Sequence, residues 1–254
     1  MLYAVCCVPV APIRIAPDHK TEMVSQLLFG ECCCVNDIDK KGWLKISCKV
    51  DGYEGWCQLA HVEEIDSTQY NYSDVLLTAD WVNEINYKGN TMFISFGSLI
   101  ATNDKSTGFT DSGLIENKFW RPTDANKTAE TIQQIAFKFL NTAYLWGGRS
   151  VFGIDCSGFA QAVYKFLNIP LLRDAKLQAL HGEVVNFLQE ACCGDLAFFD
   201  DETGEIIHVG ILLNEKEIIH AWGTVRTDKI DNEGIVNTDT GERTHRLRII
   251  KRYF

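Results

Sequence analysis

One cysteine and two histidines have the types and spacing needed for nucleophilic chemistry. Cys156 stands in GIDCSGFAQAVYKF, where a helical pattern begins directly after it. The partial positive charge of a helix N-terminus favours the reactive thiolate of a cysteine in the first turn. A cysteine nucleophile also requires a base and a group that orients the base. Of six histidines, His208 and His220 lie on consecutive predicted strands joined by the polar turn NEKE, which predicts a Cys-His-His relay.

The register of these two strands decides whether the histidines meet. Side chains alternate between the faces of a sheet along each strand. If the loop has three residues, Leu213 pairs with Glu217 and the two histidines lie diagonally on one face. A two-residue loop would place His220 on the opposite face unless a bulge intervened. The relay therefore requires an odd loop or a bulge, and His245 is the alternative if His220 points away.

The other nine cysteines have a simpler interpretation. They are Cys6, Cys7, Cys32, Cys33, Cys34, Cys48, Cys57, Cys192 and Cys193. Most stand as adjacent pairs or a triplet, and no CxxC pair has metal-ligand spacing. We expect most of these residues to be small buried apolar side chains in a reducing compartment, and we expect no metal or organic cofactor.

The elements that must position the relay divide the chain into a β-rich half and a mixed half. Residues 1–66 show short alternating strands and regularly spaced glycines, which are typical of a small β-barrel. Residues 67–122 predict a second, smaller β module. Residues 123–254 contain helical patterns at 128–140 and 156–169, followed by strands, and this order predicts an α+β domain with an antiparallel sheet. The strands expected there are 195–200, 206–213, 217–223 and 245–254.

Charge and hydropathy exclude several classes of protein. Acidic residues exceed basic ones, 34 against 24, for a formal charge of −10. Nucleic-acid binders usually carry a basic stripe, and none is visible, so we expect neither nucleic acid nor an anionic membrane as a partner. The first residues lack a basic leader, and no run of 18 apolar residues exists. We therefore expect a cytoplasmic protein without a membrane span.

Four ordered blocks in the second half resemble one known family. YLWGGRSVFGIDCSGF, RDA, GDLAFF and HVGILL with IIHAWGTVR are similar to the NlpC-type cysteine peptidases, which are bacterial peptidoglycan endopeptidases with a papain-like core. The first half, through GWLKI and GYEGW, resembles the SH3-like domains of the branch that cuts γ-D-glutamyl–diamino acid bonds. The resemblance implies SH3-like modules before a papain-like domain. The β region is short for two full barrels, which departs from the family pattern.

The same resemblance implies a role for each site residue. Cys156 attacks the carbonyl, His208 forms an ion pair with it and later protonates the leaving amine, and His220 holds the His208 ring. Tyr144, together with the backbone N–H of Cys156, stabilises the oxyanion. The residues expected to bind substrate are Glu54, Trp146, Asp155, Ser157, Arg173 and Asp174.

Two carboxylates are expected around the free amine of an N-terminal L-Ala. Asp174 belongs to the RDA block, and Glu54 is the candidate for the second carboxylate, because a desolvated ammonium needs paired charge. The alternative for Glu54 is a solvated residue at a strand end. A tyrosine of the β region is also expected near this amine, and the candidates are Tyr70, Tyr72 and Tyr87.

The implied activity is hydrolysis of the γ-D-glutamyl–L-diamino acid bond in peptidoglycan-derived tri- or tetrapeptides with a free N-terminal L-Ala. We expect a monomer that acts without a cofactor in murein peptide recycling. One alternative is an amidase or acyltransferase on the same core, against which the RDA block argues. The other is a catalytically inactive cell-wall-binding protein that uses its SH3-like modules, against which the complete Cys-His-His set argues.

Overall fold

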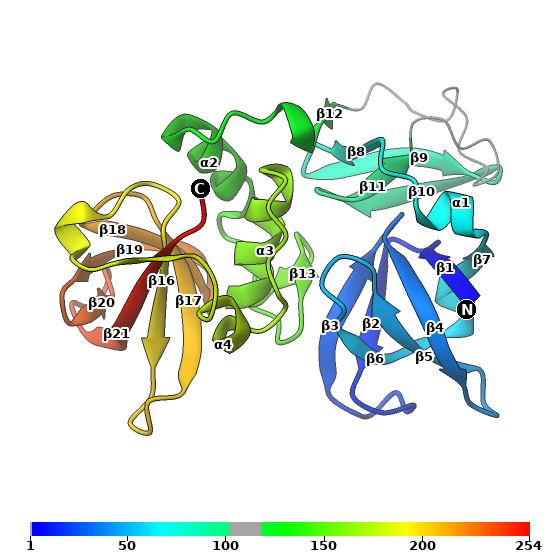
Figure 1. Cartoon of the computed structure of the whole chain (residues 1–254), viewed down its shortest axis with the longest axis horizontal. Coiled ribbons are helices and arrows are strands. Elements are labelled where there is room, and N and C mark those ends of the chain that lie inside the picture. The colour runs from blue at the N-terminus through cyan, green and yellow to red at the C-terminus, as the bar shows by residue number, and fades with distance from the viewer. Residues whose placement is uncertain (1, 102–117) are drawn as a thin grey trace. The chain divides into compact units, whose positions relative to one another are not determined.

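The computed structural model describes residues 2–101 and 118–254 and divides the chain into two compact units (Figure 1). The first unit extends to Asp124 and also contains the segment Trp146–Phe152. The second unit contains Ala125–Leu145 and Gly153–Phe254. Nothing in the sequence indicated that Trp146–Phe152 belongs to the first unit.

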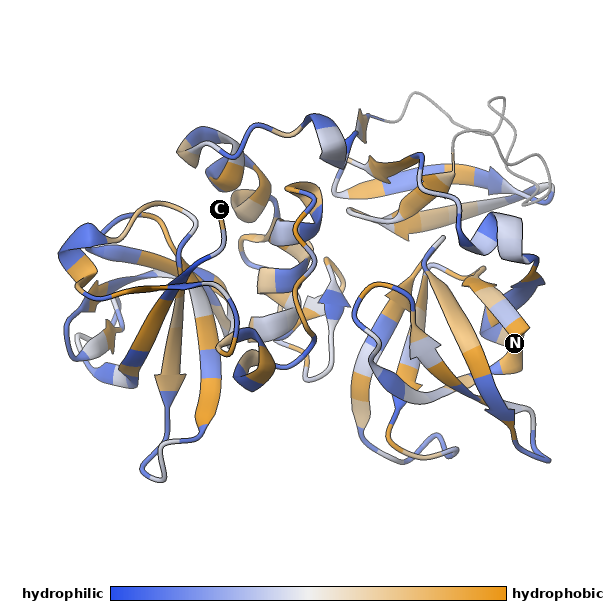
Figure 2. Cartoon of the chain, in the orientation of Figure 1, coloured by the Kyte–Doolittle hydropathy of each residue, from blue (hydrophilic) through white to orange (hydrophobic). Residues whose placement is uncertain are grey.

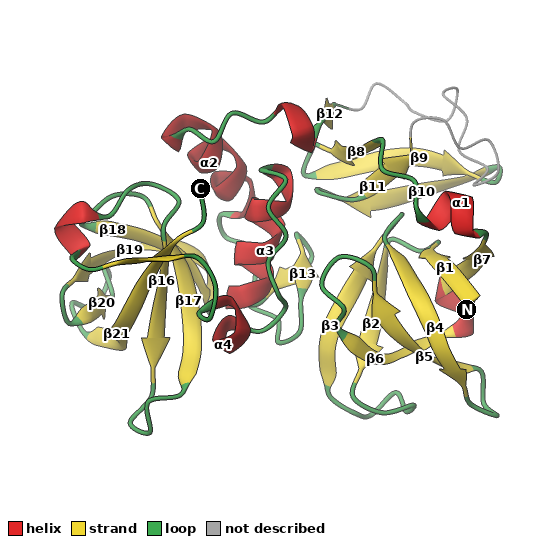
Figure 3. Ribbon diagram, viewed as in Figure 1, coloured by secondary structure: helices red, strands yellow, loops and turns green. Residues whose placement is uncertain are grey.

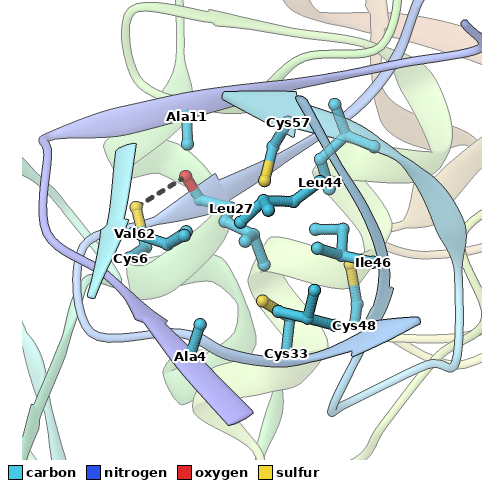
Figure 4. Close-up of a cluster of buried hydrophobic side chains, with 12 residues drawn as sticks. Ala4, Cys6, Ala11, Leu27, Cys33, Leu44, Ile46, Cys48, Cys57 and Val62 are labelled. Carbon is cyan, nitrogen blue, oxygen red and sulfur yellow. Dashed lines mark hydrogen bonds between the residues drawn. The ribbon is translucent and has the colours of Figure 1, made fainter. Parts of the chain in front are cut away.

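A seven-stranded antiparallel sheet, in the order β3-β2-β6-β5-β4-β1-β7, forms the start of the first unit. Its strands are β1 (Leu2–Cys6), β2 (Val10–Arg14), β3 (Met23–Leu28), β4 (Cys32–Ile38), β5 (Trp43–Cys48), β6 (Glu54–Gln58) and β7 (Val62–Ile65). Figure 4 shows its core, in which Cys6, Cys33, Cys48 and Cys57 pack among aliphatic side chains. Burial raises the pKa of Cys57 to about 12, so its thiol stays protonated. The four cysteines are small apolar core residues, as predicted.

Two small sheets follow in the first unit. One has the order β11-β8-β12, and the other is the hairpin of β9 and β10. The strands are β8 (Val75–Thr78), β9 (Val82–Tyr87), β10 (Asn90–Ser95), β11 (Leu99–Ala101) and β12 (Phe119–Trp120), and the short helix α1 (Ser67–Tyr70) precedes them. Their apolar cluster includes Phe29, which follows β3, so this module shares its core with the first sheet.

The second unit begins with helices whose ends follow local rules. The Thr128 hydroxyl accepts a hydrogen bond from the Thr131 N–H, so α2 (Ala129–Ala136) begins where predicted, and the 3-10 turn Phe137–Phe139 extends it. The next helix, α3 (Cys156–Phe166), ends before the predicted residue 169 because Asn168 has a left-handed backbone, with φ of 57°. The short helix α4 (Ala175–Gln178) follows.

The predicted antiparallel sheet is present and is closed into a barrel. Its order is β15-β21-β16-β17-β18-β19-β20, and β20 also pairs with β21. The strands are β15 (Glu183–Val185), β16 (Leu196–Asp200), β17 (Ile206–Leu212), β18 (Glu217–Trp222), β19 (Thr224–Asp231), β20 (Gly234–Val236) and β21 (Arg243–Arg252). The sequence did not indicate β19 and β20. The short strands β13 (Arg149–Ser150) and β14 (Gly153–Ile154) precede α3.

Helix α3 packs against β17, and α2 packs against α3 (Figure 3). The central strands β16 and β17 are mostly hydrophobic (Figure 2), and nearly all of their residues are buried. Phe159, Ala160, Val163 and Phe166 of α3 are at most 1 % exposed, in agreement with the predicted apolar face. The second unit is therefore α+β, with the nucleophile helix fixed on the barrel. Among the described residues, no helix has both the length and the apolar character of a membrane span.

Candidate active site

Cys156 is the first residue of α3, at a helix start that Asp155 fixes. The Asp155 carboxylate accepts the Gly158 N–H at 2.7 Å, which caps the helix. Cys156 is buried, and the backbone groups of Ser157 and of Val209 on β17 hydrogen-bond its sulfur. The thiol therefore lies beside the strand that carries His208. No acceptor in the described part of the chain engages the Cys156 N–H, which leaves it available to an oxyanion.

The resting protonation of the site differs from the expected ion pair. Burial raises the pKa of the Cys156 thiol to about 12, and the nearby Asp155 carboxylate acts in the same direction. Burial also lowers the pKa of His208 well below its usual range, and the neighbouring rings of His220 and His245 add to this shift. The substrate-free site therefore holds a neutral thiol and a neutral imidazole at neutral pH. Proton transfer from sulfur to His208 must accompany the attack on substrate.

The register of β17 and β18 confirms the three-residue loop. Leu213 N–H donates to the Glu217 carbonyl at 2.9 Å, and Gly210 pairs with His220. His220 consequently lies diagonal to His208 on the same face, as predicted. The Nε2 atom of His208 is 2.8 Å from Nδ1 of His220, and the two rings cross at 82°. His220 is thus in direct contact with the ring it was expected to orient.

Two further residues contact this pair; Asp228 was not predicted there, and His245 was expected only as the alternative to His220. Asp228 on β19 places Oδ2 at 3.1 Å from Nε2 of His220, and both side chains are fully buried. His245 on β21 stacks on the His208 ring with centroids 4.2 Å apart. Burial lowers the pKa of His245 to about 4, so this ring is neutral near pH 7. The tight turn at Gly223, directly after β18, was the one available signal for Asp228, because a hairpin there returns the chain beside His220.

Three residues expected to bind substrate form hydrogen bonds with one another. The Arg173 guanidinium donates to both carboxylate oxygens of Asp155, at 3.0 and 2.5 Å, and to the Ser157 hydroxyl at 2.8 Å. Arg173 is 2 % exposed, so this is a buried ion pair. The Gln178 amide also donates to the Ser157 carbonyl, at 3.1 Å. These bonds attach the RDA segment to the start of α3, and any contact of the three residues with substrate stays a prediction.

Asp174 is the residue after Arg173, and its carboxylate has no hydrogen-bond or ion-pair partner among the described residues. It occupies the N-cap position of α4, but its side chain accepts no capping hydrogen bond. Its backbone carbonyl accepts the Gln178 N–H at 3.0 Å. Within the described residues, no hydrogen bond or ion pair involves the half-buried Asp174 carboxylate. The structure therefore leaves this charge available to a ligand.

The Tyr144 hydroxyl is likewise available next to the nucleophile. Its backbone is fixed because Tyr144 N–H donates to the Gly223 carbonyl at 2.9 Å and Leu145 N–H donates to the Ile154 carbonyl at 3.1 Å. The pKa of Tyr144 is raised, mainly by burial and then by the charge that Cys156 would carry, so the phenol is close to the sulfur and stays protonated. No acceptor in the parts of the chain that the structure describes holds this hydroxyl. It can donate to an oxyanion.

Two other predicted residues lie in the first unit. Trp146 is 61 % exposed, and its Nε1–H donates to Glu22 at 2.6 Å. Glu54 is exposed and lies 3.4 Å from the Lys45 ammonium. Their contact with substrate stays a prediction.

The three tyrosine candidates also lie in the first unit. Tyr70 stacks on Tyr3 and accepts a hydrogen bond from Cys34, while Tyr87 packs against Phe29. Tyr72 lies beside an apolar pocket of this unit. None of these placements selects one tyrosine as a substrate contact.

Comparison with known proteins agrees with this geometry. Residues 141–244 match the NlpC/P60 family, and residues 13–62 match the bacterial dipeptidyl-peptidase SH3 domain. The chain is 30 % identical to the gamma-D-glutamyl-L-lysine dipeptidyl-peptidase of Bacillus subtilis, over 81 % of this chain and 74 % of that protein. It is 25 % identical to dipeptidyl-peptidase 6 of Lysinibacillus sphaericus, over 86 % and 87 %.

Solved structures show the same fold over the whole chain. An NlpC/P60 family protein from Bacillus cereus aligns with a TM-score of 0.82 at 20 % identity, over 99 % of both chains. An NlpC/P60 endopeptidase from Photobacterium damselae aligns with a TM-score of 0.72 at 16 % identity, over 97 % of this chain and 70 % of that one. With its SH3-like modules, its papain-like core and its cysteine at the start of α3, the chain belongs to the NlpC/P60 family of cysteine peptidases.

Proposed function

We propose that this peptidase hydrolyses the γ-D-glutamyl–L-diamino acid bond of peptidoglycan-derived peptides that carry a free N-terminal L-Ala. The names of its relatives, a gamma-D-glutamyl-L-lysine dipeptidyl-peptidase among them, support the bond. The observation that carries the free-amine requirement is the unengaged Asp174 carboxylate, which follows an arginine that is itself bonded to the start of α3.

The catalytic groups fit hydrolysis of an amide through a thioester. The Cys156 sulfur attacks the γ-carbonyl of D-Glu while its proton passes to His208, and a C–S bond forms. The resulting oxyanion accepts hydrogen bonds from the Tyr144 hydroxyl and the Cys156 N–H. His208 then gives its proton to the leaving amine of the diamino acid, and the C–N bond breaks. Water, deprotonated by His208, hydrolyses the thioester and releases L-Ala-D-Glu.

Recognition of the amine explains how the site would select short peptides. An ammonium group that leaves water needs a paired charge, and Asp174 supplies one, with Glu54 as the proposed second carboxylate. In intact peptidoglycan this amine is acylated by the glycan lactyl group, so the charge is absent and the space beside Asp174 must hold additional atoms. We therefore propose that the enzyme acts on released peptides rather than on the intact wall.

A direct test compares L-Ala-γ-D-Glu-L-Lys with its N-acetylated form. Loss of one charge-assisted contact costs about 1.5–3 kcal/mol, so acetylation should lower kcat/KM by at least about tenfold. The Asp174→Asn variant should lose a similar factor on the free peptide and should discriminate less between the two peptides. Glu215→Gln, an exposed carboxylate change in the same unit, is the matched control and should match the wild type. Equal wild-type rates on both peptides would contradict the proposal.

The same assay separates the alternatives. An acyltransferase would yield a product in which the dipeptide is joined to an added amine, and a wall-binding protein without activity would yield no product. We also propose a monomer that acts in the reducing cytoplasm, which light scattering and cell fractionation would test.

A further inference from the structure

The buried Asp228 carboxylate contacts His220 through the ring nitrogen that does not face His208. The chain of contacts runs from Nε2 of His208 to Nδ1 of His220 at 2.8 Å, and from Nε2 of His220 to Oδ2 of Asp228 at 3.1 Å. The side chains of His220 and Asp228 are both 0 % exposed. Water does not reach these atoms, so each contact must join one donor to one acceptor of the protein.

Asp228 is held in its ionised form by surrounding donors. Thr238 N–H donates to Oδ1 at 2.8 Å, and the Arg226 guanidinium donates to the same oxygen at 2.9 Å. Burial by itself would raise the pKa of Asp228, but the hydrogen bonds from His220, Thr238 and Arg226 hold it below its usual range. An ionised carboxylate can only accept hydrogen bonds. The proton between Asp228 and His220 is therefore carried by Nε2 of His220.

This assignment determines the protonation of both rings. Burial lowers the pKa of His220, so the ring is neutral and carries one proton. With that proton on Nε2, the Nδ1 atom of His220 is an acceptor, and Nε2 of His208 must donate to it. His208 is also neutral, so its own Nδ1 is left without a proton. An unprotonated nitrogen is what a general base requires.

We propose that Asp228 is a positioning residue that fixes the tautomers of His220 and His208, so that His208 offers an unprotonated Nδ1 to the Cys156 thiol. When His208 gains the thiol proton, its positive charge is stabilised through His220 by the Asp228 carboxylate. The catalytic consequence rests on the proposed peptidase function, whereas the tautomers are a property of the protein without substrate.

The other groups around the two rings do not fix the tautomers of His208 and His220. His245 stacks on His208 at 4.2 Å, and Phe199 lies 5.7 Å from it, so both contact the ring rather than its nitrogens. Asp239 contacts Arg226 at 2.7 Å and is 75 % exposed. Asp239 therefore provides a matched control, because it shares Arg226 with Asp228 and forms no hydrogen bond with either histidine in the described structure.

Two substitutions of Asp228 separate tautomer control from simple support of the fold. Asp228→Asn has nearly the same shape, but its NH2 group can donate to Nε2 of His220. That contact would move the His220 proton to Nδ1, reverse the bond to His208 and leave the His208 proton on Nδ1. Asp228→Ala removes the acceptor without imposing the opposite tautomer, at the cost of a cavity and of one partner of Arg226, which keeps its contacts with Asn237 and Asp239.

Asp228→Asn disturbs the packing less than Asp228→Ala does, but it should lose more activity. Asp228→Asn should lower kcat by about 100-fold or more with little change in KM, because an inverted tautomer disables a catalytic histidine. Asp228→Ala should lose less activity, and Asp239→Asn should stay within about twofold of the wild type. If Asp228→Asn retains most of the wild-type kcat, or if alanine is the more damaging change, the proposal is wrong.

A spectroscopic measurement tests the tautomers without any activity. In protein labelled with ¹⁵N-histidine, two-bond correlation spectra distinguish a protonated Nε2 from a protonated Nδ1. The wild type should show Nε2–H on both His208 and His220, and Asp228→Asn should show Nδ1–H on His220. Nδ1–H on wild-type His220 would overturn the proposal even if the variants do not fold. Failure to cleave the tripeptide would refute the proposed function and leave this spectrum unchanged.

Discussion

Replacing Asp155 with alanine should destabilise the start of the nucleophile helix more than loss of a cap alone. The carboxylate caps α3 through the Gly158 N–H at 2.7 Å and also pairs with the buried Arg173. Loss of a capping side chain costs about 1 kcal/mol. Removal of one partner from a buried ion pair typically costs about 3–5 kcal/mol, because the remaining charge stays out of water. Arg173 keeps its bond to the Ser157 hydroxyl, so we expect a total near 4 kcal/mol.

Hydrogen exchange measured by mass spectrometry is the appropriate assay, because the chain has two compact units and a single global unfolding free energy is not well defined for it. Peptides covering α3 should exchange faster in Asp155→Ala by a factor that corresponds to about 4 kcal/mol of opening free energy. Asp155→Asn keeps an oxygen for the Gly158 N–H and loses the charge, so its effect should be smaller. A change below about 1 kcal/mol in Asp155→Ala would refute the reasoning that this pair fixes Cys156.

Three further predictions follow from the protonation and geometry of the site. The rate at which iodoacetamide alkylates Cys156 should still be rising at pH 9, because burial raises the thiol pKa to about 12; a plateau near pH 6 would contradict a neutral resting thiol. The opening free energy of the barrel, measured by hydrogen exchange, should fall as the pH drops from about 6.5 towards 4, by about 1 kcal/mol per pH unit for each histidine with a lowered pKa, because the unfolded chain binds protons that the buried rings do not; His245→Gln should make this slope shallower, and an unchanged slope would count against the assigned shift. Tyr144→Phe should lower kcat by about 100-fold with little change in KM if its hydroxyl donates to the oxyanion, and a kcat near that of the wild type would remove it from that role.

The features that the sequence predicted correctly depend on local periodicity. The strict alternation of side chains reduced the placement of His208 and His220 to the length of the loop after Leu213, and the relay required the three-residue loop that the register shows. The start of α2 directly after its N-cap Thr128 and the position of Cys156 in the first turn of α3 likewise follow from short-range capping rules.

The features that it missed have no local pattern to identify them. Asp228 lies beside His220 because β19 returns in a hairpin directly after β18, but a strand as polar as TVRTDKID has little apolar periodicity to identify it. The buried Arg149 pairs with Glu31, 118 residues away, within the first unit, and no local pattern predicts this contact. Burial of Cys156 reversed the expected shift of its thiol pKa, because the sequence shows a helix start but does not show how much water remains there.

The central claim is that Cys156 hydrolyses the γ-D-glutamyl–L-diamino acid bond of a peptide with a free N-terminal L-Ala. Mass spectrometry of L-Ala-γ-D-Glu-L-Lys incubated with the enzyme tests it most directly, with Cys156→Ala as the matched control. The account predicts L-Ala-D-Glu and free L-Lys from the wild type and intact tripeptide from the variant. Intact tripeptide with both proteins, cleavage at the L-Ala–D-Glu bond, or equal cleavage by the variant would contradict it.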